Sequence, residues 1–375
     1  MPHGYIITEW TEDQGLVVKL SYPDVLEADL DDMMRIFYAH ITGAGEAGNV
    51  LVRLEKARSN VASYFTGIGS DLPVMINLML ELGEDPEMFG EAVLQEINED
   101  VLKYLRHMSS NVSQSYEIVK NLKLYLKNAL ILLDRLKNLS KEQRLAQIYT
   151  SEKARTILEA LQEKPLSRRE LQGIVEDKLQ KIVPNIEYVL DPFIKTGLIM
   201  QDWVEGDTDI TLFLITDFSI FRAPVDKLVE DAKKNIPNPE LAATYLEEVN
   251  HFFNDYKPNF DDNLKIAQII MNPDNYDYIT LFRERAYPVS KIPKAPGQSI
   301  DEVGYFLKSL ADNKIIKLIK DTKDTLWVFL LTNITIHTFY PEYLIEKIRK
   351  DRMDEKIKRN VAIKHLEFLE KTYSK

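Results

Sequence analysis

The segment LFLITDFSI, residues 212–220, returns as VFLLTNITI, residues 328–336, with a spacing of 116 residues. Three apolar positions upstream repeat with a spacing of 117, namely Leu190 with Leu307, Leu198 with Ile315 and Ile199 with Ile316. The one-residue difference falls between two predicted strands, where insertions are readily tolerated. The second half of the chain is therefore predicted to contain two tandem copies of one module.

Each copy is predicted to form three helices followed by two strands. In the first copy, the apolar periodicity places helices at 152–162, from Ser167 onward and at 178–196, the last interrupted or shifted at Pro184. It places strands at 198–204 and 210–215. In the second copy, it places helices at 264–271, 276–285 and 299–312, and strands at 315–319 and 326–331. This order resembles winged-helix modules at 151–222 and 263–340, with a helical linker at 223–262 and C-terminal helices at 341–375.

The composition excludes several classes of protein. The chain has 375 residues, of which 45% are hydrophobic and 28% charged, so it is long enough for several domains with cores of their own. It contains no Cys and six scattered His, which argues against thiol chemistry, disulfides and zinc sites. No apolar run approaches the ~18 residues of a membrane helix, and no signal-peptide pattern opens the chain. We expect no cofactor, no membrane insertion and a cytoplasmic location.

The charge is uneven along the chain. Residues 1–108 contain 19 acidic against 7 basic side chains, whereas the remainder contains 40 of each. An acidic N-terminal segment repels phosphate backbones and anionic lipid, so any nucleic-acid contact would have to come from the neutral remainder. The simpler interpretation of the acidic segment is a solvated surface that aids solubility.

Alternation of β-rich and amphipathic segments indicates one domain in residues 1–108. Two strands, 4–10 and 16–22, flank a turn with Gly15, which can take the positive φ of a hairpin. Further strands are predicted at 50–54, 60–65 and 74–82, with helices at 29–40 and from Asp85-Pro86 to Leu105. The expected order is β-β-α-β-β-β-α.

One motif in this domain, GAGEAG at residues 43–48, matches the dinucleotide fingerprint GxGxxG. The fingerprint works only where the glycines follow a strand and open a helix, because the pyrophosphate sits on helical N–H groups. Here a helix is predicted before the motif and a strand after it. We interpret it as a turn and expect no nucleotide.

The N-terminal pattern resembles the small longin/roadblock-type α/β domains common in archaeal proteins. The resemblance rests on the hairpin GYIITEW…GLVVKLSYP, the helix MMRIFYAH, the strand SNVASYFTGI and the segment LPVMINLMLELGEDPEMFGEAVLQEINEDVL. It implies a platform that binds small GTPases or pairs with another such domain, and it brings no catalytic residues. Followed by winged helices, this order also resembles the nitrogen permease regulator-like subunits of eukaryotic nutrient-sensing GTPase-activating complexes.

Residues 109–150 are predicted to form a long connecting helix. Its apolar residues follow a heptad-like seam of Ile118, Leu122, Tyr125, Ala129, Leu132 and Leu136. Such a seam can pair with a second copy of the chain, giving a homodimer. It can equally pack against the chain's own domains, which the additional leucines Leu126, Leu130 and Leu133 favour by widening the stripe. Both alternatives remain open.

Winged helices raise the question of nucleic-acid binding. A recognition helix needs outward basic or amide side chains, yet the last helix of the second copy contains Asp301, Glu302 and Asp312 against Lys308 alone. The best basic cluster is the loop with Arg283, Arg285, Lys291 and Lys294, which could contact phosphates. Protein-binding or spacer modules are the alternative that the charge favours.

Catalytic patterns are missing from the sequence. The acid pairs Asp31-Asp32, Asp261-Asp262 and Glu84-Asp85 lie where acids commonly begin helices. No GxSxG, HExxH or Walker motif occurs.

The sequence thus predicts an α+β protein: a longin/roadblock-like domain at 1–108, a connecting helix at 109–150, two winged-helix modules and C-terminal helices. We expect a non-enzymatic regulatory or scaffolding protein whose N-terminal domain docks a small GTPase or another roadblock/longin domain. The alternative is a nucleic-acid-binding regulator that uses the winged helices.

Overall fold

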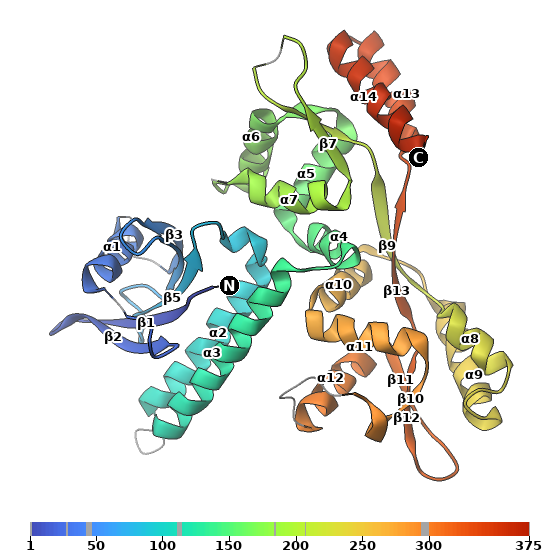
Figure 1. Ribbon diagram of the computed structural model, residues 1–375, viewed down its shortest axis with the longest axis horizontal. Helices are drawn as coiled ribbons and strands as arrows, with labels where there is room; N and C mark the ends of the chain where they lie inside the picture. The colour runs from blue at the N-terminus through green and yellow to red at the C-terminus, as the bar shows by residue number, and fades with distance from the viewer. Residues whose placement is uncertain are drawn as a thin grey trace. The chain divides into compact units, whose positions relative to one another are not determined.

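The computed structural model describes residues 2–27, 29–42, 47–110, 115–183, 185–206, 208–293 and 300–374. Its contacts divide the chain into two compact units, Met1–Leu139 and Ser140–Lys375. Both units mix helices with antiparallel strands (Figure 1), which agrees with the predicted α+β class.

The N-terminal unit is built on one five-stranded antiparallel sheet. Its strands are β1 (Gly4–Thr11), β2 (Gly15–Tyr22), β3 (Gly48–Leu54), β4 (Ser59–Phe65) and β5 (Val74–Glu81), in the order β2-β1-β5-β4-β3. The predicted opening hairpin is confirmed, and Gly15 takes a φ of +71° at its turn. The central strand β5 is buried from Val74 to Leu80 because helices cover both faces of the sheet.

Helices lie on both faces of this sheet. Helix α1 (Leu30–Ile41) buries Met33, Ile36 and Phe37 against one face, and its N-terminus is capped by the Asp29 carboxylate. Helices α2 (Glu91–Ser110) and α3 (Ser115–Lys137) contribute to a second core on the other face. The unit therefore has three layers, with the sheet in the middle.

Two predicted features of this unit are the helix from Pro86 and the glycine motif at 43–48. The helix expected from Pro86 begins only at Glu91, because Gly90 takes a φ of +87° and separates it from the short 3-10 helix η1 (Pro86–Met88). Residues 43–46 of the glycine motif lie outside the described residues. The motif follows α1 and precedes β3, so a helix comes before it and a strand after it, as predicted.

The expected connecting helix at 109–150 is not continuous. Helix α3 ends at Lys137 within the N-terminal unit, and α4 (Lys141–Thr150) begins the second unit. A new helix starts there because Ser140 and Gln143 form a capping box, each side chain bonding the other residue's backbone N–H.

The second unit consists of two repeats. The first contains α4, α5 (Glu152–Glu163), β6 (Leu166–Ser167), α6 (Arg168–Leu179), α7 (Ile186–Thr196), β7 (Ile199–Asp202), β8 (Thr211–Leu214), β9 (Asp217–Ala223), α8 (Asp226–Lys233) and α9 (Pro239–Asp255). The second contains α10 (Phe260–Met271), α11 (Pro273–Glu284), β10 (Tyr287–Pro288), η3 (Val289–Lys291), α12 (Ile300–Asp312), β11 (Ile316–Lys320), β12 (Leu326–Leu330), β13 (Asn333–Phe339), α13 (Glu342–Met353) and α14 (Arg359–Tyr373).

The predicted duplication is confirmed by the sheets. The first repeat has the strand order β6-β8-β7, and the second has the matching order β10-β12-β11. Between the preceding helix and β7 or β11, the chain passes through a residue with positive φ, which is Gly197 in the first repeat and Lys314 in the second. In both repeats the backbone N–H groups of two consecutive residues then donate to a single carbonyl, that of Leu198 or of Ile315. The segments found by self-comparison are thus equivalent strands.

The repeats are interlocked, which the sequence did not predict. Strands β9 and β13 pair with each other as a separate antiparallel ribbon, with Ile220 opposite Ile336 (Figure 1). Each strand leads into a pair of helices that packs on the sheet of the other repeat. Helices α8 and α9 of the first repeat are therefore equivalent to α13 and α14 of the second. The segment 223–262, which was expected to be a linker, contains α8 and α9 and so belongs to the repeated structure.

Two matching contacts hold the exchanged helix pairs. The Tyr245 hydroxyl on α9 donates to the Leu330 carbonyl on β12 at 3.0 Å, and its ring stacks on Phe329. His365 on α14 takes the same position, with Nε2 2.7 Å from the Leu214 carbonyl on β8. Because both side chains are buried, each repeat depends on the other for part of its core.

Candidate functional site

Arg283, the first residue of the predicted phosphate-binding loop, is occupied inside the protein. Its guanidinium donates to the Asn333 side chain at 2.8 Å, to the Ile334 carbonyl at 3.0 Å and to the Glu142 carboxylate at 2.9 Å. In the first repeat, Gln162 makes the corresponding bond to Asp217 at 2.9 Å. Arg283 therefore joins helices to the β9–β13 ribbon, and its guanidinium is held by protein partners.

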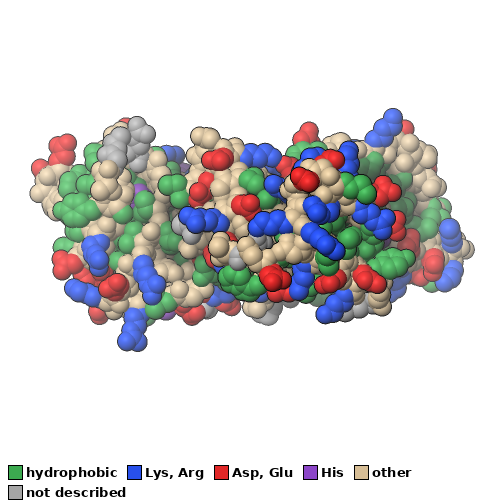
Figure 2. All heavy atoms as spheres, turned by 90° about the horizontal axis from the view of Figure 1, so that it is seen from above, with side chains coloured by type: hydrophobic (Ala, Val, Ile, Leu, Met, Phe, Trp, Pro, Cys, Tyr) green, Lys and Arg blue, Asp and Glu red, His purple; other side chains and the backbone are tan. Residues whose placement is uncertain are grey.

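Of the other residues of that loop, the structure describes Arg285 and Lys291. Arg285 is exposed and lies over the Tyr287 ring at 4.6 Å. Lys291 is exposed at the end of η3, and Lys294 lies outside the described residues. Figure 2 shows basic and acidic side chains interspersed over the face it views, with no continuous basic surface there.

The predicted dimer seam is used within the N-terminal unit. Leu122, Ala129 and Leu136 are buried in the core beneath the sheet, together with Leu126, Leu130 and Leu133. Tyr125 and Leu132 pack against the edge of this core, and Ile118 is half-buried. The seam is thus covered by the chain itself, as the intramolecular alternative predicts, because the wide leucine stripe fits a sheet better than one partner helix.

The acid pairs have structural partners. Asp31 and Asp32 lie in the first turn of α1, as predicted for residues that favour a helix N-terminus. Glu84 accepts a bond from the Glu81 backbone and pairs with Lys137. Asp262 does more than begin a helix, because both of its oxygens bind Arg222 and one also accepts from the Tyr256 hydroxyl at 2.8 Å.

Arg222 lines a hollow of about 590 Å³ between β9, α9, α10 and β11. Its side chain is only 4% exposed and also donates to the Asn313 carbonyl at 3.0 Å and the Thr332 hydroxyl at 3.1 Å. Burial alone would raise the pKa of Asp262, but bonds from Arg222 and Tyr256 outweigh it and hold this pKa below its usual range. The arginine is fully committed to the fold, so the hollow offers a ligand no unpaired buried charge.

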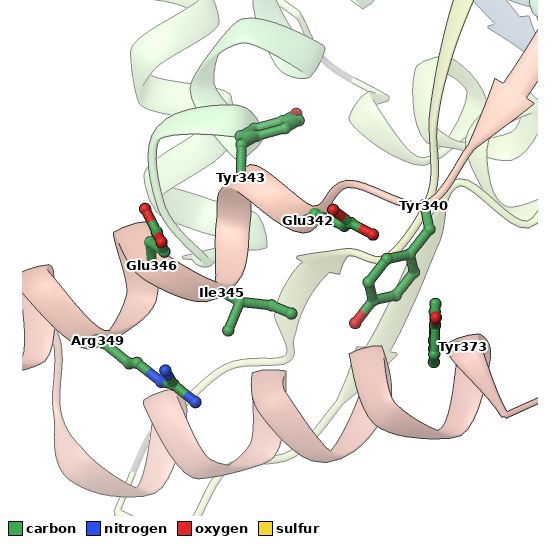
Figure 3. A pocket seen from close by; sticks show the side chains of 7 residues that line it. All are labelled: Tyr340, Glu342, Tyr343, Ile345, Glu346, Arg349 and Tyr373. Carbon is green, nitrogen blue, oxygen red and sulfur yellow. The ribbon is translucent and has the colours of Figure 1, made fainter.

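A second hollow, of about 520 Å³, lies between α13 and the end of α14. Tyr340 and Tyr373 lie side by side there, with Glu342 beside Tyr340 and Arg349 farther along α13 (Figure 3). The Tyr343 hydroxyl donates to Asp217 at 2.7 Å, so it is engaged with the ribbon. We call this hollow the C-terminal trough. No motif in the sequence identified it, because Tyr340 and Tyr373 lie 33 positions apart.

The N-terminal unit has a different open feature. Strand β3 lies at one edge of its sheet, pairs with β4 alone among the described strands and packs beside α1. On α1, Leu30 and Tyr38 are 55% and 56% exposed. An edge strand beside exposed apolar side chains is a surface that another protein can cover.

His365 gives the second unit a defined response to pH. Its Nε2 donates to the Leu214 carbonyl, and its buried Nδ1 has no partner among the described residues, so the imidazole is neutral. Burial lowers the pKa of His365 to about 4, although the carbonyl favours the charged form. Protonation would bury a charge and an unpaired N–H.

We therefore expect the second unit to lose stability as the pH falls. The unfolded chain takes up the proton near pH 6.5 and the folded chain near pH 4, so unfolding gains protons between these values. From pH 6.5 to pH 5.5 the loss is about 1 kcal/mol. Urea unfolding at both pH values measures it. His365→Gln, which keeps a donor for Leu214, is expected to flatten this dependence, and an unchanged slope in the variant would contradict the assignment.

Two kinds of site are absent from the residues that the structure describes. No group of three or more His, Asp or Glu side chains there is placed to hold a metal ion. Within the same residues, no helix combines the length and the apolar composition needed to cross a bilayer. Comparison with protein-family models and with curated proteins finds no match for this chain.

Proposed function

We propose that this protein is a non-enzymatic scaffold or regulator whose N-terminal unit docks a small GTPase or another roadblock/longin-type domain. In this proposal the N-terminal unit is a longin/roadblock-like domain, and the two repeats of the second unit are winged-helix modules that bind protein. The single observation that carries it is the edge strand β3 beside α1, with exposed Leu30 and Tyr38. An added strand can pair with such an edge while apolar side chains cover the helix.

Two further observations support the proposal. The N-terminal unit has the predicted order β-β-α-β-β-β-α, extended by the helix α3, and this order supports the proposed longin/roadblock-like fold. Its excess of acidic residues suits a basic protein partner and opposes nucleic acid or anionic lipid.

Binding assays on the full chain test the docking surface. We expect it to bind either a small GTPase, loaded with GDP or a non-hydrolysable GTP analogue, or an isolated roadblock/longin domain. Tyr38→Ala should weaken that binding about 10-fold or more, because exposed aromatic residues carry much of an interface's energy.

A matched control separates this surface from a general loss of apolar area. Tyr116 on α3 is 85% exposed, so Tyr116→Ala removes an equal side chain elsewhere on the unit. Tyr116→Ala should leave the affinity unchanged. The proposal fails if no member of either partner class binds, or if both tyrosine variants bind equally weakly.

The contacts of Arg283 weaken the case for the alternative function, nucleic-acid binding. Arg283 is held by Asn333, Ile334 and Glu142, and its guanidinium is not presented to a phosphate. A mobility-shift assay distinguishes the two functions, because affinity for DNA or RNA would fall steeply with added salt. We expect no such salt-dependent complex.

A further inference from the structure

The C-terminal trough places two aromatic faces at its mouth. The ring centroids of Tyr340 and Tyr373 are 4.9 Å apart, with their planes inclined at 53°. Tyr373 is the last residue of α14, and Tyr340 lies just before α13, so two helices position the pair. Inclined rings of this kind form a corner in which the electron-rich faces can attract a cation.

The charges around this corner are predominantly negative. Glu342 and Glu346 are exposed on α13 at the trough, and neither forms an ion pair with another described residue. Burial, followed by the charges of Glu342, Tyr373 and Glu370, raises the pKa of Tyr340. Arg349 is the basic residue of the lining, and it lies farther along α13 from the two rings (Figure 3).

The first repeat shows that the fold does not require these tyrosines. By the 116-residue spacing of the repeats, Pro224 takes the place of Tyr340 and Asp226 that of Glu342. Tyr245 and His365 occupy equivalent positions in the two repeats, so Phe253, eight residues after Tyr245, is equivalent to Tyr373. The repeats share a carboxylate and an aromatic residue, but Pro224 gives the first repeat no counterpart of the Tyr340 ring, and Phe253 contacts Phe252 and Tyr256 instead.

We propose that the C-terminal trough binds the cationic group of a lysine or arginine side chain from a partner protein. The ammonium or guanidinium lies against the faces of Tyr340 and Tyr373, and Glu342 supplies the opposite charge. A volume of about 520 Å³ accommodates such a side chain. This inference concerns the second unit and goes beyond the docking surface proposed for the first.

Saturation-transfer NMR on the full chain tests the site with small probes. Butylammonium and methylguanidinium represent the two side chains, and 1-butanol is the neutral analogue of the first. We expect both cations to bind, and 1-butanol to bind several-fold more weakly. Tyr340→Leu and Glu342→Gln should each weaken cation binding about 3- to 10-fold at constant ionic strength.

The first repeat provides the matched control. Asp226 is exposed at the position of Glu342, so Asp226→Asn removes the same charge from the equivalent place, which lacks the Tyr340–Tyr373 pair. This variant should bind both cations as the unaltered chain does. Equal binding of 1-butanol and butylammonium would overturn the proposal, as would a loss in Asp226→Asn equal to that in Glu342→Gln.

Discussion

Replacing Arg222 by methionine is expected to destabilise the second unit by about 3–5 kcal/mol, because it leaves a partly buried carboxylate without its partner. Methionine fills a similar volume, so the loss reports mainly the missing bonds. Asp262 would lose both bonds from the guanidinium, and the Asn313 carbonyl and the Thr332 hydroxyl would each lose a donor. Urea unfolding followed by hydrogen exchange in β9 and β13 measures the effect.

An exposed ion pair serves as the control for Arg222. Lys227 and Glu284 form a pair in which both side chains are more than half exposed. Lys227→Met should cost less than about 1 kcal/mol, because solvent screens exposed pairs. If Arg222→Met costs no more than Lys227→Met, Arg222 does not hold α10 and the ribbon together as described.

Phe213→Ala is expected to cost about 3–5 kcal/mol and to release α13 and α14 from the first repeat. Phe213 is fully buried on β8, where its ring contacts His365 at 5.4 Å and Phe368 at 5.3 Å between centroids. The truncation leaves a cavity and removes these ring contacts between α14 and the sheet of the first repeat. Hydrogen exchange should therefore accelerate in α14 before it does in α5 or α7.

Phe339 on β13 offers a comparison with an equal side chain. It is 39% exposed, so Phe339→Ala should cost less than about 1 kcal/mol and leave α14 protected. Unchanged protection of α14 in Phe213→Ala would mean that other contacts, such as the ion pair of Lys364 with Asp202, hold the helix pair in place.

Local patterns predicted most elements of both units. Residues 59–65 alternate in burial, and Ser167 with Glu170 forms the capping box of a helix. Such signals depend on residues a few positions apart, which is why they can be read without the fold. The short strands β6 and β10 were missed because two residues carry no periodicity.

The candidate sites were harder to predict because their residues meet only in the fold. Arg283 and Arg285 are two positions apart, yet one guanidinium is enclosed by β13 and α4 whereas the other is exposed. Arg222 has no sequence neighbour among its partners, since Asp262 lies 40 positions away. A lone arginine in the apolar segment DFSIFRA was the one available signal that a buried partner was needed.

The sequence by itself determined the β-hairpin at the N-terminus, the helix caps and the duplication in the second half, because periodicity, turn residues and self-similarity are local properties. The tertiary structure alone decided that β9 and β13 pair and that each repeat's final helices pack on the other repeat. The physical reason is that equivalent sheets offer equivalent apolar surfaces. A helix pair can complete either sheet with similar contacts, and only the path of the whole chain selects between them.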